Sequence, residues 1–579
     1  MESQTKTCQN CKKDFTIEPD DFAFYEKIKV PPPTFCPDCR LQRRMGWRNE
    51  RSLYKRKCSA PGHNEEIISM YAPDSPYNIV DLKYWWSDEW DPLDYGQPYD
   101  FNKPFFQQFA ELTQRVPLLS LSVVNSVESD YTNYVDGNKN CYLVFGSGWN
   151  ENVNYGSKIM RNKDSQDLLG DGRCELTYEC INCVECYKLL YSLNCKNCVN
   201  SFFLYNCRNC QNCIGCANLN NKSYCVFNEQ FTREEYQKKF EEMRLNTVAG
   251  INIARFKFRE VCLSVPNRYA NIFNSVDCTG ENIDSSKNSK YCFDIFEKME
   301  DSKYMFGSLN SKDNYDGVGI FQNPLCYETS DANVGQNVRF SLTIYASHNI
   351  DYSWNCHSSS NLFGCVGIRS KNYCILNKQY TKEEYETLVP KIIEHMNSNP
   401  YVDKKERVYR YGEFFPIDVS PFAYNETTAQ EYFNLSKDQI EQSAFRWRDT
   451  IDRNYVPTRK ADDLPQSAGE ITDDFSKEII ECLHKGECHH QCTKAFRFIL
   501  PELQFYKKLD IPLPKLCPNC RHYERLRQRN PLKLWHRQCM CDKPNHGHDG
   551  KCPNEFETSY APDRPETVYC EQCYQQEVV

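Results

Sequence analysis

The sequence lacks the features that would send a protein out of the cytoplasm or into a membrane. The opening residues, MESQTKTCQN, contain no basic segment followed by an apolar stretch, and no apolar run approaches the roughly 20 residues that span a bilayer. The net charge of −9 at pH 7 excludes a protein coated in positive charge, so any surface for nucleic acid must be local. We therefore expect a cytoplasmic protein with reduced thiols and no membrane association.

A recognisable catalytic motif is also missing. Acidic residues gather at positions 164–175 and again at 313–316, but nothing distinguishes them from carboxylates in solvated turns. No small-molecule substrate is indicated. We therefore favour a protein that is not an enzyme.

Cysteine, by contrast, is abundant, at 34 of 579 residues, and much of it lies in two similar modules at the ends of the chain. Residues of the same type recur 481 positions apart: Cys11 and Cys492, Cys36 and Cys517, Cys39 and Cys520, Arg40 and Arg521, Arg44 and Arg525, Arg48 and Arg529. Each module contains two short cysteine knuckles separated by 24 residues, a spacing that brings four ligands around a tetrahedral metal. The duplication therefore predicts zinc in both modules.

We predict three structural zinc ions, each held by four cysteines. The ligand sets are Cys8, Cys11, Cys36 and Cys39; Cys488, Cys492, Cys517 and Cys520; and Cys539, Cys552, Cys570 and Cys573. In the second set His489 competes with Cys488 as the fourth ligand, and we prefer the softer thiolate. Near the third set, Cys541, His546 and His548 are spare donors that would allow a ligand exchange.

The amino-terminal module has an incomplete counterpart of the third set. Alignment on the shared YAPD segment leaves Cys58, His63 and Asp81 as three ligands with an open fourth position, the arrangement that catalytic zinc requires. The alternative is that this site has lost its metal and is filled by the packing of nearby tryptophans. We favour loss of the metal, because no general base is evident beside it.

Arginines follow the second knuckle of each module at a spacing of four residues. On a helix this spacing makes one basic stripe, formed by Arg40, Arg44 and Arg48 in one copy and by Arg521, Arg525 and Arg529 in the other. Such a stripe could bind phosphates, with RNA favoured, and nearby aromatic residues could stack on bases. The alternative is that these arginines form ion pairs within the protein or with a partner protein.

A second duplication fills the centre of the chain. The segment SYCVFNEQFTREEYQKKF reappears 149 residues later as NYCILNKQYTKEEYETLV, and each copy contains a threonine and acidic residues that typically begin a helix. Cysteines recur at every twelfth position, as at Cys183, Cys195 and Cys207. This pattern favours stacked coils with inward cysteines. The run Cys207-x2-Cys210-x2-Cys213-x2-Cys216 also resembles a ligand string for an iron–sulfur cluster or for zinc. Ser359 and Leu362 replace Cys210 and Cys213 in the duplicate, which favours packing.

The fold we predict is mainly β, with a duplicated parallel β-helix flanked by small zinc-ribbon-like α+β modules. The predicted divisions are a zinc-ribbon-like module at 1–100, a helical linker at 101–122, β-helix repeats at 123–228 and 266–377, helices at 229–265 and 378–397, an aromatic-rich extended arm at 398–480, and a double zinc-binding module at 481–579.

Several segments resemble a group of uncharacterised cysteine-rich bacterial zinc-ribbon proteins. The matching motifs are CPDCRLQRRMGWRNER, YAPDSPYNIVDLKYWWSDEWDP, CPNCRHYERLRQRNPLKLWHRQC and VYCEQCYQQEV. This resemblance implies zinc binding and no assigned activity. Members of the group carry a second CxxC pair where this sequence has Asp81 and Tyr84, which argues against metal at Cys58 and His63. We therefore predict a zinc-binding scaffold without catalytic activity that binds nucleic acid or, alternatively, another protein.

Overall fold

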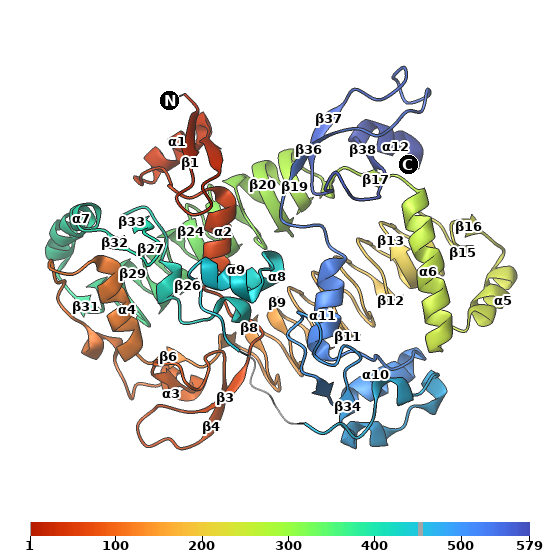
Figure 1. Cartoon of the computed structure of the whole chain (residues 1–579), viewed down its shortest axis with the longest axis horizontal. Helices are drawn as coiled ribbons and strands as arrows, with labels where there is room; N and C mark the ends of the chain where they lie inside the picture. Colours follow the sequence, from red (N-terminus) through yellow and green to blue (C-terminus); the bar gives the residue numbers. More distant parts are fainter. Residues whose placement is uncertain (1, 450–454, 579) are drawn as a thin grey trace. The chain divides into compact units, whose positions relative to one another are not determined.

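A computed structural model describes residues 2–449 and 455–578 of the chain (Figure 1). It is mostly β-structure with extensive parallel sheets, as predicted. The chain forms two compact units, and each unit combines two separate stretches of sequence. The first unit contains Met1–Ser122 and Ala270–Arg448, and the second contains Val123–Tyr269 and Asp449–Val579. Each unit therefore joins one end module to one set of central repeats.

The central part of the second unit is a ladder of short parallel strands. Each residue pairs with the twelfth residue after it, as in the pairs Val123–Val135 and Phe202–Ile214, and single bridges continue the same step between the strands. The parallel strands are β7 (Val123–Val124), β8 (Asn133–Asp136), β9 (Phe145–Gly148), β10 (Glu151–Asn154), β11 (Lys163–Gln166), β12 (Tyr187–Leu190), β13 (Val199–Tyr205), β14 (Ile214–Ala217) and β15 (Cys225–Val226). The last strand, β16 (Glu229–Gln230), pairs antiparallel with β15.

Asparagine occupies many of the turns of this ladder. The backbone has a positive φ at every third residue over long stretches, for example at Asn194, Asn197 and Asn200. Among residues with a side chain, asparagine is one of the few that adopts this left-handed conformation routinely. The residue after each turn points inward, and Cys195 and Cys198 are accordingly at most 1% exposed. The frequent Asn-Cys pairs of the sequence thus encode a turn followed by a core position.

The densest cysteine run lies in the same interior. Its four side chains are at most 1% exposed and lie in one core cluster with the other inward cysteines: Cys207, Cys210, Cys213 and Cys216. Each thiol donates a hydrogen bond to the backbone carbonyl two residues earlier, as from Cys207 to Tyr205 at 3.4 Å. The prediction that these cysteines face inward from a stacked ladder is confirmed.

The first unit contains a larger, mostly parallel sheet with the same pairing step over much of its length. Tyr315 pairs with Tyr327 and Leu342 with Trp354, whereas the step between the first strands is one position shorter or longer. The strands are β18 (Ile272–Phe273), β19 (Val276–Asp284), β20 (Lys287–Ile295), β21 (Met299–Lys303), β22 (Ser311–Lys312), β23 (Tyr315–Phe321), β24 (Tyr327–Asn333), β25 (Gln336–Arg339), β26 (Leu342–Tyr345), β27 (His348–Asp351), β28 (Trp354–His357), β29 (Ser360–Phe363), β30 (Asn372–Ile375) and β31 (Lys378–Gln379).

A helix follows each set of repeats and begins at the predicted threonine. Thr232 caps α5 (Arg233–Met243) and Thr381 caps α7 (Lys382–Ser398), and each forms a reciprocal capping box with the glutamate three residues later. In the second unit α6 (Val248–Ser264) runs beside β13 and β14 (Figure 1). These helices confirm the helix starts read from the sequence.

The end modules repeat one order of elements, a hairpin followed by two helices and then a second hairpin, a short strand and a last helix. In the first unit these are β1 (Gln4–Thr7), β2 (Asp14–Ile17), α1 (Pro19–Lys27), α2 (Pro37–Met45), β3 (Tyr54–Lys57), β4 (Glu66–Ser69), β5 (Ile79–Val80) and α3 (Leu82–Trp86). In the second unit they are β34 (Ile480–Glu481), β35 (Ala495–Phe496), α10 (Leu500–Leu509), α11 (Pro518–Arg527), β36 (Trp535–Gln538), β37 (Glu555–Thr558), β38 (Val568–Tyr569) and α12 (Glu571–Val578).

The segments predicted as linker and arm are packed into the fold. In the segment 101–122, α4 (Phe105–Arg115) buries Phe105 and Phe109, and the ring of Phe109 stacks on Phe415 at 4.5 Å. The segment 398–480 supplies β32 (Tyr401–Val402), β33 (Val408–Tyr409), α8 (Thr428–Tyr432) and α9 (Lys437–Gln442), and its residues 450–454 lie outside the described part. The first segment thus contains a helix whose phenylalanines belong to the core.

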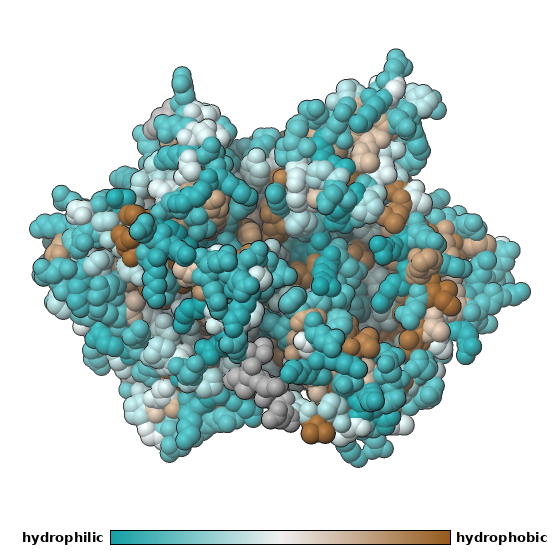
Figure 2. Space-filling view, in the orientation of Figure 1, coloured by the Kyte–Doolittle hydropathy of each residue, from teal (hydrophilic) through white to brown (hydrophobic). Residues whose placement is uncertain are grey.

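Hydrophilic residues cover most of the face shown in Figure 2, where hydrophobic residues form small separate patches. No helix in the described part of the chain has both the length and the apolar character needed to cross a membrane.

Candidate metal centres and buried arginine clusters

The four amino-terminal cysteines meet as the sequence predicts. The sulfur atoms of Cys8, Cys11, Cys36 and Cys39 lie within 4.8 Å of one another, and Cys11 and Cys36 are 3.7 Å apart. Zinc–sulfur bonds of about 2.3 Å in a tetrahedron separate neighbouring sulfurs by about 3.8 Å. The backbone N–H of Cys36, at the start of α2, donates to Cys8 Sγ at 3.2 Å. The site can therefore hold a tetrahedral metal ion.

The equivalent site in the second unit uses a cysteine that the sequence alignment missed. Cys482, Cys492, Cys517 and Cys520 converge, and the N–H of Cys517 donates to Cys482 Sγ at 3.3 Å, as Cys36 does to Cys8. The predicted fourth ligand, Cys488, is outside this group, and its competitor His489 is exposed. Both predictions for the fourth position are corrected to Cys482.

An insertion explains that error. Nine residues separate Cys482 from Cys492, whereas two separate Cys8 from Cys11, so the constant offset places Cys8 on His489, next to Cys488, instead of on Cys482. Cys482 directly follows the strand β34 (Ile480–Glu481), as Cys8 directly follows β1, and this shared position after the first strand of the module was the available signal.

The third set of cysteines converges as predicted. Cys539, Cys552, Cys570 and Cys573 form one group, with Cys552 and Cys570 separated by 3.9 Å. Once more a backbone N–H, here that of Cys570 just before α12, donates to the first cysteine, Cys539, at 3.2 Å. The same local geometry therefore recurs at all three cysteine groups.

Further donors lie beside the two carboxy-terminal groups. His484, Cys488 and His490 gather around Cys520, and Cys541 and His546 gather with Cys573, where His548 Nε2 lies 3.4 Å from the Cys573 sulfur. The sequence identified Cys541, His546 and His548 as spare donors, but it did not identify His484 and His490.

The incomplete site of the amino-terminal module is assembled from its three predicted residues. Cys58 Sγ lies 3.7 Å from His63 Nδ1 and 3.3 Å from Asp81 Oδ2, and His63 and Asp81 are 3.0 Å apart. Burial raises the pKa of the Cys58 thiol. Burial would also raise the pKa of Asp81, but hydrogen bonds from the Tyr84 N–H and the Cys58 thiol lower it overall. Tyr84 occupies the place of Cys573, so the three groups satisfy one another without a fourth ligand.

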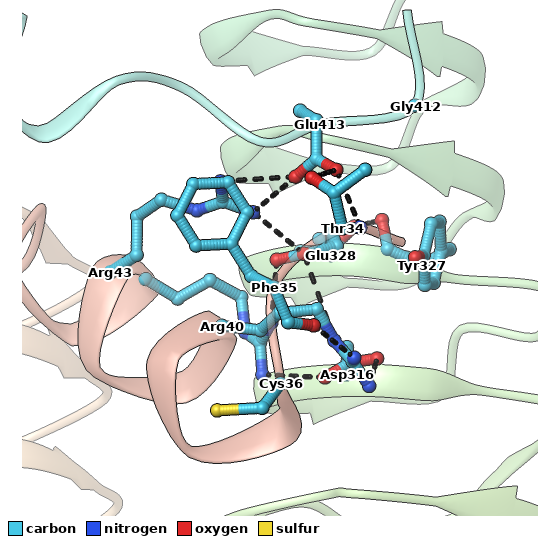
Figure 3. Close-up of polar contacts among 12 residues, drawn as sticks. Thr34, Phe35, Cys36, Arg40, Arg43, Asp316, Tyr327, Glu328, Gly412 and Glu413 are labelled. Atoms are coloured by element: carbon cyan, nitrogen blue, oxygen red, sulfur yellow. Dashed lines mark hydrogen bonds and ion pairs between the residues drawn. The ribbon is translucent and has the colours of Figure 1, made fainter. Parts of the chain in front are cut away.

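The arginines after the second knuckle of the amino-terminal module point into the first unit. In Figure 3, Arg40 and Arg43 extend from α2 toward carboxylates on the neighbouring strands. Arg40 Nη2 lies 2.9 Å from Asp316 Oδ2, and Arg43 Nη2 lies 2.9 Å from Glu328 Oε1. Arg44 contacts both carboxylates, at 3.1 Å and 2.5 Å. Burial raises the pKa of Glu328, although Arg44 and Arg43 oppose this effect.

The second unit repeats this cluster. Arg521 Nη1 on α11 lies 2.7 Å from Asp167 Oδ2, and Arg525 Nη1 lies 2.8 Å from Asp167 Oδ1 and 3.1 Å from Glu179. Glu502 on α10 also accepts a hydrogen bond from Arg521 at 3.2 Å. Asp167 is fully buried, so these charges are paired in the interior.

These contacts correct the prediction that the arginine stripes contact phosphates. Arg40, Arg44, Arg521 and Arg525 are at most 2% exposed and pair with carboxylates of the same unit. Arg48 is also buried and pairs with Glu50 at 2.6 Å. Arg529 is half-buried. The alternative reading, ion pairs within the protein, describes the observed contacts.

Comparison with protein-family models gives no match, and neither does comparison with curated protein sequences. Among solved structures, a chain described as a "putative acetyltransferase" from Desulfovibrio desulfuricans G20 shows 12% identity over 55% of this chain and 78% of that chain, with a TM-score of 0.10. A score this low carries no argument about fold or function.

Proposed function

We propose that this protein is a zinc-binding, non-catalytic scaffold that acts in the cytoplasm. The supporting observation is that each of the three cysteine tetrads includes the residue directly before a short helix: Cys36 before α2, Cys517 before α11 and Cys570 before α12. Two of these helices, α2 and α11, insert arginines among the carboxylates of the adjoining parallel ladder. Metal binding at such closed thiolate sites contributes directly to folding.

The parallel ladders suggest that each set of repeats closes into a β-helix. The pairing step is constant over most of both sets, and in the first set a left-handed residue recurs every three positions. Four such corners per step bring the chain back above its starting point. Coils of this kind offer long regular surfaces, which are suited to binding an extended partner.

A protein is the partner class that these observations favour. The prediction of RNA binding rested on the arginine stripes, and most of their guanidinium groups are engaged in buried ion pairs. Nucleic acid on another surface is the competing proposal. The absorbance ratio of the purified protein, together with a salt titration of RNA binding, distinguishes the two, since phosphate contacts produce a steep salt dependence.

Elemental analysis of the purified full chain tests the metal assignment. We expect at least three zinc ions per chain, and chelation is expected to expose the thiols of the cysteine groups and to unfold the end modules. Fewer than three ions, with freely reactive thiols in a folded protein, would refute the proposal.

A further inference from the structure

Cys520 and Cys573 each lie between two sets of metal-ligating side chains. We infer that each carboxy-terminal centre holds two zinc ions that share one thiolate, with Cys520 as the bridge in one centre and Cys573 in the other. The inference rests on the proposed zinc-binding function and extends it. It assigns three further ligands to each of these two centres and makes each a two-ion cluster instead of a single-ion site.

In the first centre, Cys520 belongs to two groups of four donors. It lies with Cys482, Cys492 and Cys517 on one side, and with His484, Cys488 and His490 on the other. Within each group the donor atoms lie within 4.8 Å of one another. The sulfur of Cys520 is 3.8 Å from that of Cys482 and 3.6 Å from that of Cys488. Both distances match the edge of about 3.8 Å expected between two thiolates on one zinc ion.

The histidines of this centre are placed for coordination. His490 is 3% exposed, and its ring stacks on Tyr523 at 5.3 Å. Among the described residues, neither ring nitrogen of His490 has a hydrogen-bond partner, and the same holds for Nδ1 of His484. The carboxylate of Glu524 lies 3.9 Å from His490 Nδ1, beyond hydrogen-bond distance. A buried imidazole without a partner is costly unless a metal occupies its lone pair. The ring of His484 lies 5.3 Å away, so both rings face the same place.

In the second centre, a cysteine again lies between two groups of donors, which come from other helices and loops of the module. Cys573 completes the group of Cys539, Cys552 and Cys570, and it also groups with Cys541 and His546. Cys541 Sγ lies 3.1 Å from His546 Nδ1, and His548 Nε2 lies 3.4 Å from Cys573 Sγ. A nitrogen and a sulfur on one zinc ion are separated by about 3.6 Å. In this centre Cys541, His546 and the shared Cys573 form a group of three donors, and His548, which lies outside that group but contacts Cys573, is the candidate for the fourth ligand of the second ion.

The outer nitrogen of each of these two histidines faces an acceptor: His548 forms a hydrogen bond there, and His546 has an ion-pair contact. His548 Nδ1 donates to the carbonyl of Gly550 at 2.8 Å, which leaves Nε2 as the nitrogen facing Cys573. His546 Nε2 lies 3.5 Å from a carboxylate oxygen of Glu577, which leaves Nδ1 facing Cys541. Zinc-bound histidines commonly have such outer partners, because these partners orient the ring and raise its basicity.

Charge balance favours the second ion. One zinc ion held by four thiolates leaves a buried site with two excess negative charges. Adding a second ion and one more thiolate, Cys488 or Cys541, brings two positive charges against one negative charge. The excess is therefore halved, which lowers the cost of burying the cluster.

The amino-terminal module provides an internal contrast. Cys39 occupies the position of Cys520, but its sulfur accepts a hydrogen bond from Asn10 Nδ2 at 3.2 Å. At the position of Cys573 this module has Tyr84, which cannot bridge. We therefore expect one ion at the amino-terminal group and five zinc ions in the whole chain.

The experiment uses the full chain reconstituted with cadmium-113. Nuclear magnetic resonance should show two pairs of cadmium signals and one single signal. Within each pair the two ions should be coupled through their shared sulfur, and the fifth ion should be uncoupled. X-ray absorption of the zinc protein should show a zinc–zinc separation below about 4.6 Å, since both ions bond to one sulfur at about 2.3 Å. Cys488→Ser and Cys541→Ser should each lower the metal content by one ion and remove one coupled pair. Cys278→Ser, at a half-buried cysteine of β19, is the control and should leave both measurements unchanged.

The possible outcomes separate this inference from the function on which it rests. Three bound ions without any coupled pair would overturn the inference and leave the zinc scaffold intact. One coupled pair among four ions would overturn it for the centre that lacks the pair. Fewer than three ions would overturn both. The cadmium spectrum of the parent protein decides the question even if a serine variant does not fold.

Discussion

Arg44 Nη2 lies 3.1 Å from Asp316 Oδ1, and the second unit repeats this contact between Arg525 and Asp167 at 2.8 Å. The arginines are 481 residues apart in sequence and the aspartates 149 residues apart, so two independent duplications meet at one ion pair. The contact between a helix that begins at a cysteine knuckle and a parallel ladder is therefore present twice, each time within a single unit. This repetition indicates that the buried ion pairs have a structural role in joining the helix to the ladder.

We predict that Arg44→Gln destabilises the first unit by about 3–5 kcal/mol. The substitution leaves Asp316 and Glu328 buried with fewer positive partners, and a stranded buried charge is costly. Denaturant or thermal unfolding of the first unit measures the effect. Lys55→Gln is the control, because its ion pair with Glu66 is exposed and should contribute less than about 1 kcal/mol. Equal stability of the two variants would contradict the structural role assigned to Arg44.

The triple variant Arg40→Gln, Arg44→Gln and Arg48→Gln separates ion pairing from nucleic-acid binding. We expect a destabilised protein whose parent has no salt-dependent affinity for RNA, because these guanidinium groups are buried. A variant that stays stable but binds RNA less tightly than the parent, with a shallower salt dependence, would restore the phosphate-binding hypothesis.

Local rules predicted much of the fold. The helix starts at Thr232 and Thr381 follow from capping chemistry, and the inward cysteines follow from the constant period of the repeats. Eleven of the twelve predicted zinc ligands converge, because the spacing within a knuckle is a local constraint.

The failures involve long-range contacts. A sequence period gives the spacing of the arginine stripe but not what the stripe faces, and its partners Asp316 and Glu328 belong to strands that come much later in the chain. The order of segments along the chain also did not predict that each end module packs with the more distant set of repeats. Cys482 was missed because an insertion broke the alignment on which the ligand choice depended.

Cys482→Ser should release the thiols of the first carboxy-terminal group. Cys482 is the sulfur that accepts the N–H of Cys517 and completes the tetrad, and metal binding at such sites contributes about 10–16 kcal/mol in small zinc domains. We expect Cys492 and Cys517 to become reactive toward thiol reagents and the melting temperature of the second unit to fall. If Cys488→Ser exposed these two thiols and Cys482→Ser did not, the original ligand assignment would be correct.

Asn194→Ala should destabilise the second unit by about 1–2 kcal/mol. Asn194 has a φ of 55°, which alanine tolerates poorly, and its side chain accepts a hydrogen bond from Asn182 at 3.2 Å. Asn194→Gly is the matched control, because it loses the same hydrogen bond while allowing the left-handed backbone. Chemical denaturation should therefore rank the parent first, glycine second and alanine last. Alanine at least as stable as glycine would show that backbone conformation does not govern this position.

The last prediction concerns pH and depends on His357 in the first unit. This side chain is surrounded by aromatic rings, with Tyr345 stacked on it at 5.2 Å and Trp86 at 4.8 Å, and its Nε2 shares a hydrogen bond with Asn355 at 3.0 Å. Burial, assisted by the positive charge of Arg369, lowers the pKa of His357 to about 3. The folded state therefore keeps the imidazole neutral at a pH where the unfolded chain protonates it.

The sign of the effect follows from proton linkage. Above the unfolded pKa of about 6.5 neither state binds the proton, and the contribution of His357 to stability is fully present. As the pH falls from about 6.5 toward 3, the unfolded state gains a proton that the folded state does not, so up to about 1.4 kcal/mol of stability is lost per pH unit. His357→Gln removes this linkage, and its unfolding free energy should fall less steeply than that of the parent between pH 7 and pH 5. Metal content is measured at each pH in both proteins, because protonation of thiolate ligands releases zinc from either one. Parallel stability curves at equal metal content would show that His357 is not held neutral by its surroundings.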